Sequence, residues 1–88
     1  MNKLLDGQEL ARFSKNAYDD VRLTFHKLGT GQSVDIRVWA KIRPSDDAPS
    51  IQTSLGLALA VELLPDLRRA IDQAIAALGG GHAPEAKP

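Results

Sequence analysis

The segment Val34-Asp35-Ile36-Arg37-Val38-Trp39-Ala40-Lys41-Ile42 decides the fold, because its side chains alternate between two kinds of face. Side chains alternate faces along a strand, so this pattern predicts a β-strand with one buried, apolar face. The opposite face carries the only tryptophan of the chain, Trp39, between the cations Arg37 and Lys41. An apolar ring between two cations on an open sheet face suits a flat, anionic ligand.

The remaining sequence predicts three more strands, over 9–15, 21–28 and 51–60, and a helix over 64–78. Gly29-Thr30-Gly31-Gln32 predicts a tight hairpin before the central strand, since glycine supplies positive φ. A phosphate-binding loop is a poor alternative there, because neither a Lys-Ser/Thr pair nor a helix follows. Gly56 predicts a bulge or a close backbone approach. We expect Phe13 in the core and Asp19-Asp20 in a solvated turn.

The helix is apolar over a wide arc. Its apolar residues recur at spacings of three and four and span about 160°, whereas a helix on one sheet needs a stripe of roughly 100°. The surplus favours a homodimer in which a second chain covers the helix, although alanine is also a good helix former at the edge of a stripe. The predicted dimer interface consists of Leu64, Leu67, Ile71, Ile75 and Leu78.

Composition places the chain among small single domains. Of its 88 residues we expect 1–8 to be a flexible N-terminus, 9–78 the domain and 79–88 a disordered tail. The sequence has no cysteine, no clustered histidines and no long apolar run. We therefore expect a cytoplasmic protein with no metal, no cofactor and no membrane span. Residues 1–43 carry eight Lys/Arg and five Asp/Glu, so any anion-binding surface should lie in this half.

The chain resembles the transcriptional positive cofactor 4 family, small coactivators that bind single-stranded DNA. The resemblance covers roughly residues 12–75, through the stretches 13–16, 19–23, 34–39, 56–59, 62–67 and 70–71. Its most specific part is the core Asp35-Ile36-Arg37-Val38-Trp39, with Lys15-Asn16 ahead of it and Leu64-Pro65-Asp66-Leu67 behind it. It implies an α+β fold with a curved antiparallel sheet of four strands backed by one C-terminal helix (β-β-β-β-α). It also implies a homodimer whose partners are single-stranded DNA and the transcription machinery, and nucleoid association in a bacterium. The sequence has Leu28 where the family usually has an aromatic residue, and it lacks some of the family's basic residues.

The predicted nucleic-acid-binding residues are chosen on two grounds, a shared parity on the strands and the family resemblance. They are Lys15, Arg22, His26, Arg37, Trp39 and Lys41. On this hypothesis Trp39 stacks on a base and the cations meet phosphates, while Asp35 either pairs with Arg37 or repels the ligand. The alternatives are that Trp39 caps the sheet or lies in a dimer interface, or that the chain is a dimeric protein-interaction module with weak or no DNA binding. No nucleophile–base pair, metal cluster or nucleotide loop points to an enzyme.

Overall fold

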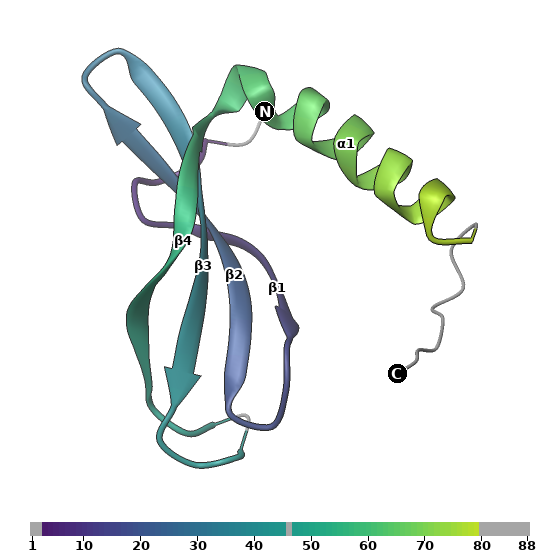
Figure 1. Cartoon of the computed structure of the whole chain (residues 1–88). Helices are drawn as coiled ribbons and strands as arrows, with labels where there is room; N and C mark the ends of the chain where they lie inside the picture. Colours follow the sequence, from purple (N-terminus) through teal and green to yellow (C-terminus); the bar gives the residue numbers. More distant parts are fainter. Residues whose placement is uncertain (1–2, 46, 80–88) are drawn as a thin grey trace.

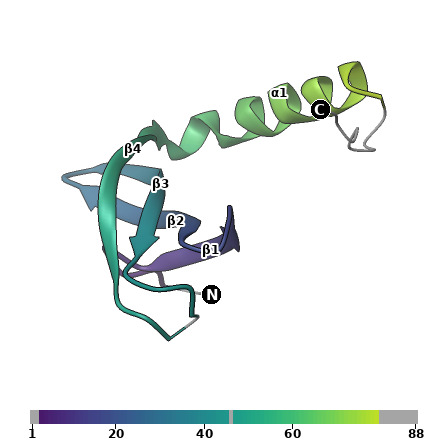
Figure 2. The ribbon, with the colours of Figure 1, turned by 60° about the horizontal axis from the view of Figure 1, so that its bottom comes forward.

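The strands and the helix follow the predicted order. The computed structural model describes residues 3–45 and 47–79. Its elements are β1 (Glu9–Ser14), β2 (Asp19–Leu28), β3 (Gly31–Lys41), β4 (Ser50–Ala60), the 3-10 turn η1 (Val61–Leu63) and α1 (Leu64–Ala77). The strands form one antiparallel sheet in the order β1-β2-β3-β4 (Figure 1). The sheet is curved (Figure 2), so the expected α+β fold is confirmed.

The ends of the chain were expected to be flexible. Residues 1–2 and 80–88 lie outside the described residues. Residues 5–8 form a turn that joins the sheet, where the amide of Gly7 donates to the carbonyl of Phe25 at 2.7 Å. In return the amide of Phe25 donates to the carbonyl of Gln8 at 2.8 Å. The turn therefore lies beside β2 and helps to shape the face that β2 presents.

Glycine acts at the two places where the pattern predicted it. In the β2–β3 hairpin, Leu28 pairs with Gly31, and Gly29 in the two-residue loop has φ +59°. The register between β3 and β4 shifts after Arg37, which is the predicted irregularity. At Gly56 a Cβ atom would lie 2.3 Å from the carbonyl oxygen of Ile36, so no other residue fits without backbone movement.

The core of a single chain is small. Val34 and Phe25 face each other across β2 and β3 with 2% and 4% of their surface exposed. Phe13 was expected in the core as well, but this is wrong, because 60% of its surface is exposed. It lies on β1 opposite Val21, at the margin of the apolar face of the sheet, where the described residues leave it open.

Helix α1 does not cover the sheet of its own chain. It projects from the end of β4 (Figures 1 and 2), and its main contacts are with η1. The radius of gyration is 15.3 Å, against about 12 Å for a compact domain of this length. The expectation of an intrachain cover is therefore wrong. An apolar stripe indicates that one side of a helix is buried, but it does not indicate whether the same chain or a second chain packs against that side.

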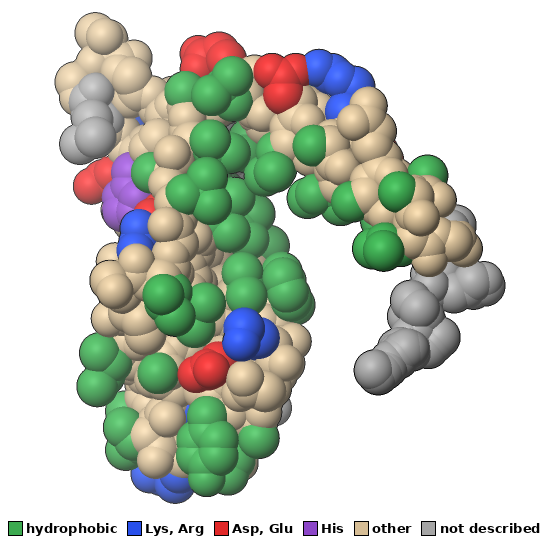
Figure 3. All heavy atoms as spheres, in the orientation of Figure 1, with side chains coloured by type: hydrophobic (Ala, Val, Ile, Leu, Met, Phe, Trp, Pro, Cys, Tyr) green, Lys and Arg blue, Asp and Glu red, His purple; other side chains and the backbone are tan. Residues whose placement is uncertain are grey.

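Two apolar surfaces consequently face an open space. One is the apolar sheet face, which we define as Phe13, Ile36, Leu55 and Leu57, and the other is the helix stripe, which comprises Leu64, Leu67, Ile71, Ile75 and Leu78. Figure 3 shows apolar side chains along the underside of the helix and on the sheet opposite. Half or more of the surface of Leu55, Leu57, Ile71 and Leu78 is exposed. Contiguous exposed apolar surfaces of this kind mark an interaction site.

Candidate nucleic-acid interface

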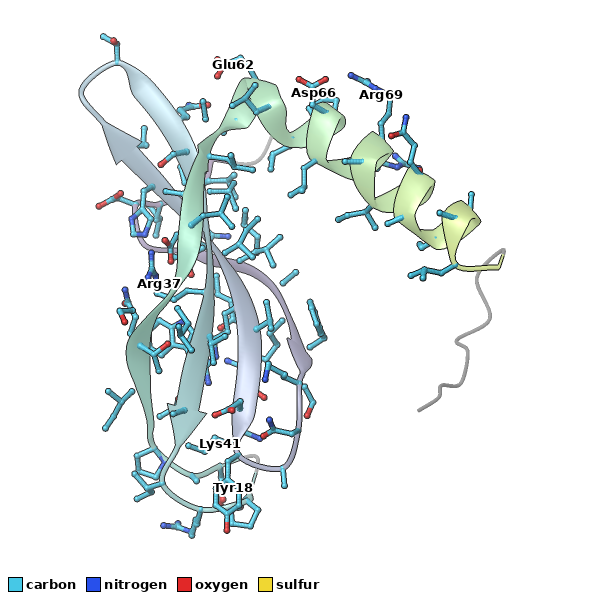
Figure 4. The ribbon with its side chains drawn as sticks, viewed as in Figure 1. Tyr18, Arg37, Lys41, Glu62, Asp66 and Arg69 are labelled. Carbon is cyan, nitrogen blue, oxygen red and sulfur yellow. The ribbon has the colours of Figure 1, made fainter. Side chains whose placement is uncertain are left out.

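The register of β2 and β3 brings five of the six predicted residues onto one face. Arg22 pairs with Arg37 and Asp20 pairs with Trp39, and directly paired residues of antiparallel strands share a face. His26 and Lys41 follow at the same parity. We call this surface the polar sheet face, and its members on these strands are Asp20, Arg22, Thr24, His26, Asp35, Arg37, Trp39 and Lys41. Arg37 projects from the sheet on the side away from α1 (Figure 4).

Lys15 is not brought together with the other predicted residues. It follows β1 at the parity of Phe13, and it lines a hollow with Val21, Ile36 and Leu55. These neighbours belong to the opposite, apolar side of the sheet. The structure thus separates Lys15 from the tryptophan that the other cations surround.

Asp20 is the centre of an ion-pair cluster that the sequence did not reveal. Its carboxylate lies 3.3 Å from Arg22 Nη2, 3.5 Å from Lys41 Nζ and 3.6 Å from Arg12 Nη1. The residue is 4% exposed, so its assignment to a solvated turn is wrong. The turn closes earlier than expected, because the Asp19 carbonyl accepts hydrogen bonds from the amides of residues 15 and 16. Strand β2 therefore begins at Asp19 and carries Asp20 into the sheet.

Arg37 and Asp35 form a two-pronged ion pair. Arg37 Nε donates to Asp35 Oδ2 at 2.9 Å, and its Nη2 donates to Oδ1 at 2.7 Å. Charge-assisted bidentate pairs of this geometry are among the stronger hydrogen bonds in proteins. Hydrogen bonding to Asp35 raises the pKa of Arg37. The two alternatives for Asp35 are thereby resolved for the free chain, since it pairs with Arg37.

The indole of Trp39 is covered by a guanidinium. The Cζ atom of Arg22 lies 4.7 Å from the ring centroid, within the range of a cation–π contact. Arg22 Nη2 also donates to Ser50 Oγ on β4 at 2.8 Å and to Asp20 Oδ2 at 3.3 Å. The Arg22 side chain therefore crosses the sheet face from β2 to β4, over Trp39 on β3. The indole lies on the side predicted, and α1 does not cover it.

A hollow of about 280 Å³ adjoins the ring. Its lining combines polar and apolar surface from all four strands and the N-terminal turn, and consists of Gly7, Glu9, Arg22, Thr24, His26, Asp35, Trp39 and Gln52. At its rim His26 Nδ1 lies 3.5 Å from Asp6 Oδ1, which ties the imidazole to the N-terminal turn. The hollow offers both hydrogen-bond donors and acceptors beside an aromatic ring.

The polar sheet face carries a small excess of positive charge. The register places four cations and three carboxylates there, namely Arg12, Arg22, Arg37 and Lys41 with Glu9, Asp20 and Asp35. Arg12 reaches Glu9 at 2.7 Å, and this hydrogen bond lowers the pKa of Glu9. The strands thus contribute one positive charge in excess, while Asp6 and His26 lie together at the rim of the hollow. An excess this small attracts anions weakly, and salt screens the attraction.

Sequence reasoning considered Asp35 as a partner of Arg37, but it missed the ion pairs of Asp20 and Glu9, the cation Arg12, and Ser50. Arg12 could have been found, because it alternates with Phe13 along β1 and therefore lies on the polar side. Glu9 could not, because it has the parity of Phe13 and only the register shift between Glu9 and Ala11 places it opposite Thr24. Ser50 could not have been found either, because its position opposite Lys41 depends on the register shift between β3 and β4. Within 3–45 and 47–79 no three His, Asp or Glu residues are grouped as metal ligands. Among the same residues, no helix has both the length and the apolarity that a membrane span needs.

Comparison with solved structures agrees with this geometry. The chain is similar to two crystal forms of a PC4 homolog from Burkholderia pseudomallei, each with a TM-score of 0.67. In the orthorhombic form the identity is 20%, over 83% of this chain and 95% of that chain. In the tetragonal form it is 23%, over 78% and 97%. The chain has the fold of a PC4 homolog. PC4 abbreviates positive cofactor 4, so the fold implied by the sequence resemblance is confirmed.

The likeness to the PC4 homolog extends over nearly the whole of the chain in those crystal structures. No family model matches the chain, and no curated protein matches it. The PC4 fold therefore positions the polar sheet face, and the chemistry of that face rests on the residues of this chain.

Proposed function

We propose that the chain is a PC4-type protein that binds single-stranded DNA and regulates transcription. The observation that supports this proposal most is the grouping of Trp39 with Arg22, Arg37 and Lys41 on a sheet face that α1 leaves open. An aromatic ring within a cationic groove is the arrangement that proteins use to hold single strands without reading their sequence. The fold shared with a PC4 homolog supports the same assignment.

Binding divides into stacking and phosphate contacts. One base stacks on Trp39, which contributes about 1–3 kcal/mol and tolerates any base. Arg37, Arg22 and Lys41 lie on two adjacent strands on the face that carries the ring, so a backbone that crosses β2 and β3 passes close to each of them. In the free chain the side chains of Arg22 and Lys41 are only 13% and 8% exposed, so they reach a phosphate after leaving Asp20. Each phosphate neutralised should add about −0.7 to the dependence of log affinity on log salt. A duplex keeps its bases stacked and cannot offer one to the ring.

A second copy of the chain covers the apolar surfaces. The apolar sheet face and the helix stripe both lie open in the single chain, and contiguous exposed apolar surface of this kind marks an interaction site. In a symmetric dimer the same patch serves both subunits, so one association buries two helix stripes and two sheet faces. The interface residues we propose on the helix are Leu64, Leu67, Ile71, Ile75 and Leu78. This arrangement leaves both polar sheet faces free for DNA.

One observation favours a second candidate function. Asp20 and Asp35 neutralise the cations next to Trp39 in the free chain, which weakens attraction to phosphates. The candidate is a dimeric module that binds proteins, including components of the transcription machinery, with weak or no DNA binding. In both cases we propose a binding protein rather than an enzyme. We also propose that it acts in the cytoplasm, on the nucleoid if the cell is bacterial.

The two functions are separated by titrating the chain with a fluorescent oligonucleotide, single-stranded in one series and duplex in the other, each at two salt concentrations. The DNA proposal predicts a rise in anisotropy with the single strand that is larger than with the duplex and that shrinks with salt. It also predicts a change in the emission of Trp39, the only tryptophan. Unchanged anisotropy and emission with the single strand at low salt would favour the protein-interaction module.

A further inference from the structure

The place where a base would stack on Trp39 is already occupied in the free chain. The Arg22 guanidinium lies over the ring at 4.7 Å, and only 13% of its side chain is exposed. Two anchors hold it there, the Asp20 carboxylate on its own strand and the Ser50 hydroxyl on β4. A base cannot lie against the same ring surface while the guanidinium remains.

The covered state leaves two donors without acceptors. Arg22 Nε and the indole Nε1 of Trp39 are both buried, and neither has a hydrogen-bond partner among the described residues. A buried donor without an acceptor has lost its hydrogen bonds to water and forms none within the protein, which raises the free energy of that state. Both donors would regain acceptors if the guanidinium moved off the ring, because both residues line the hollow described above. The hydrogen bonds of Arg22 to Asp20 and Ser50 thus stabilise the covered state, whereas the two unpaired donors destabilise it.

We propose that Arg22 is a removable cap on the base-stacking site. When a single strand binds, a nucleobase takes the place of the guanidinium on Trp39, and the freed guanidinium turns to a phosphate of the same strand. This inference rests on the proposed function and adds to it the residue that controls access to the ring. It makes Arg22 a positioning residue in the free chain and a ligand contact in the complex. Because stacking tolerates any base, the exchange selects for an unpaired strand rather than for a sequence.

The anchors of the cap set how readily the exchange occurs. The hydrogen bond from Arg22 to Ser50 is lost in Ser50→Ala, so the covered state is weakened while the phosphate contact remains available. We expect the single strand to bind about two- to tenfold more tightly to this variant. Ser54→Ala, a substitution of the same size on the same strand, is the matched control and should leave the affinity unchanged. Ser50→Ala is preferred to a change at Asp20, whose burial among three cations makes its removal a risk to folding.

The movement itself is measured by NMR on the full chain labelled with 15N, through the arginine Nε–H signals. A ring shifts the signals of protons that lie over its face, so the Arg22 signals in the free chain should be displaced from those of an ordinary arginine. They are assigned by their loss in Arg22→Gln. On addition of a single-stranded oligonucleotide we expect them to return toward ordinary values, together with a change in Trp39 emission.

Each outcome of the two experiments decides the matter. Loss of the Arg22 displacement on binding, with tighter binding by Ser50→Ala than by Ser54→Ala, supports the exchange. If the oligonucleotide binds while the Arg22 signals keep their displacement, or if the two serine variants bind equally, the cap is not removed and the inference is overturned while the proposed function stands. Absence of oligonucleotide binding by the unmodified chain overturns both.

Discussion

Asp35→Asn should strengthen binding of single-stranded DNA. In the free chain both oxygens of Asp35 accept hydrogen bonds from Arg37, at 2.7 and 2.9 Å. A phosphate on the remaining edge of the guanidinium would lie roughly 6 Å from this carboxylate, where like charges repel by about 0.7–1.4 kcal/mol at an effective dielectric of about 40–80. Removal of the charge should therefore tighten binding about three- to tenfold. Asparagine keeps one acceptor oxygen for Arg37, so we expect the fold to survive.

The assay is anisotropy of a labelled single strand at several salt concentrations. The freed Arg37 neutralises one phosphate more completely, so the dependence of log affinity on log salt should steepen by up to about 0.7. Asp66→Asn is the matched control, because it makes the same change in net charge on the exposed side of α1, where Asp66 pairs with Arg69 (Figure 4). If Asp35→Asn binds no more tightly than Asp66→Asn, Arg37 does not contact phosphate and the reasoning fails.

Three further predictions test the stacking, the dimer and the sheet. Trp39→Ala should weaken single-strand binding about 5- to 150-fold in the same assay, whereas Tyr18→Ala, at the end of the sheet, should not. Light scattering should give twice the 9.5 kDa mass of one chain, and a monomer mass would exclude the dimer. Ile71→Glu should reduce the mass to that of a monomer, whereas Gln73→Glu, on the other side of the helix, should leave the dimer intact. Gly56→Ala should lower the free energy of unfolding by about 1–3 kcal/mol and the melting temperature by roughly 5–20 °C, because its Cβ would meet the β3 backbone. An unchanged melting temperature would show that the strands adjust.

The sequence predicted the sheet well because local signals and tertiary structure agree there. Alternation along 34–42 identified β3 and its two faces, and the register with β2 then followed from the two-residue hairpin at Gly29. Gly56 was correctly expected at an irregularity, since a missing side chain is a direct sign of close backbone approach. The change of period after residue 60 located the helix, and α1 begins at Leu64 with Pro65 in its first turn, where proline costs little.

The errors arise where the outcome depends on contacts far along the chain or outside it. Asp20 looked like a turn residue because two adjacent acids and an asparagine precede the apolar run, yet three cations from three strands draw it into the sheet. Phe13 and the cover supplied by α1 were assigned to a core that one chain does not complete. Periodicity identifies a face that is to be buried, but the partner that buries it has to be inferred from what remains exposed.

The most direct test of the account is a map of the amide and side-chain signals that shift when a single-stranded oligonucleotide is added to the 15N-labelled chain. The account predicts that the shifts concentrate on the polar sheet face, at Arg22, Arg37, Trp39 and Lys41, while the polar side of α1 around Asp66 stays unchanged. Shifts confined to the helix or to the apolar sheet face, or no shifts at low salt, would contradict it.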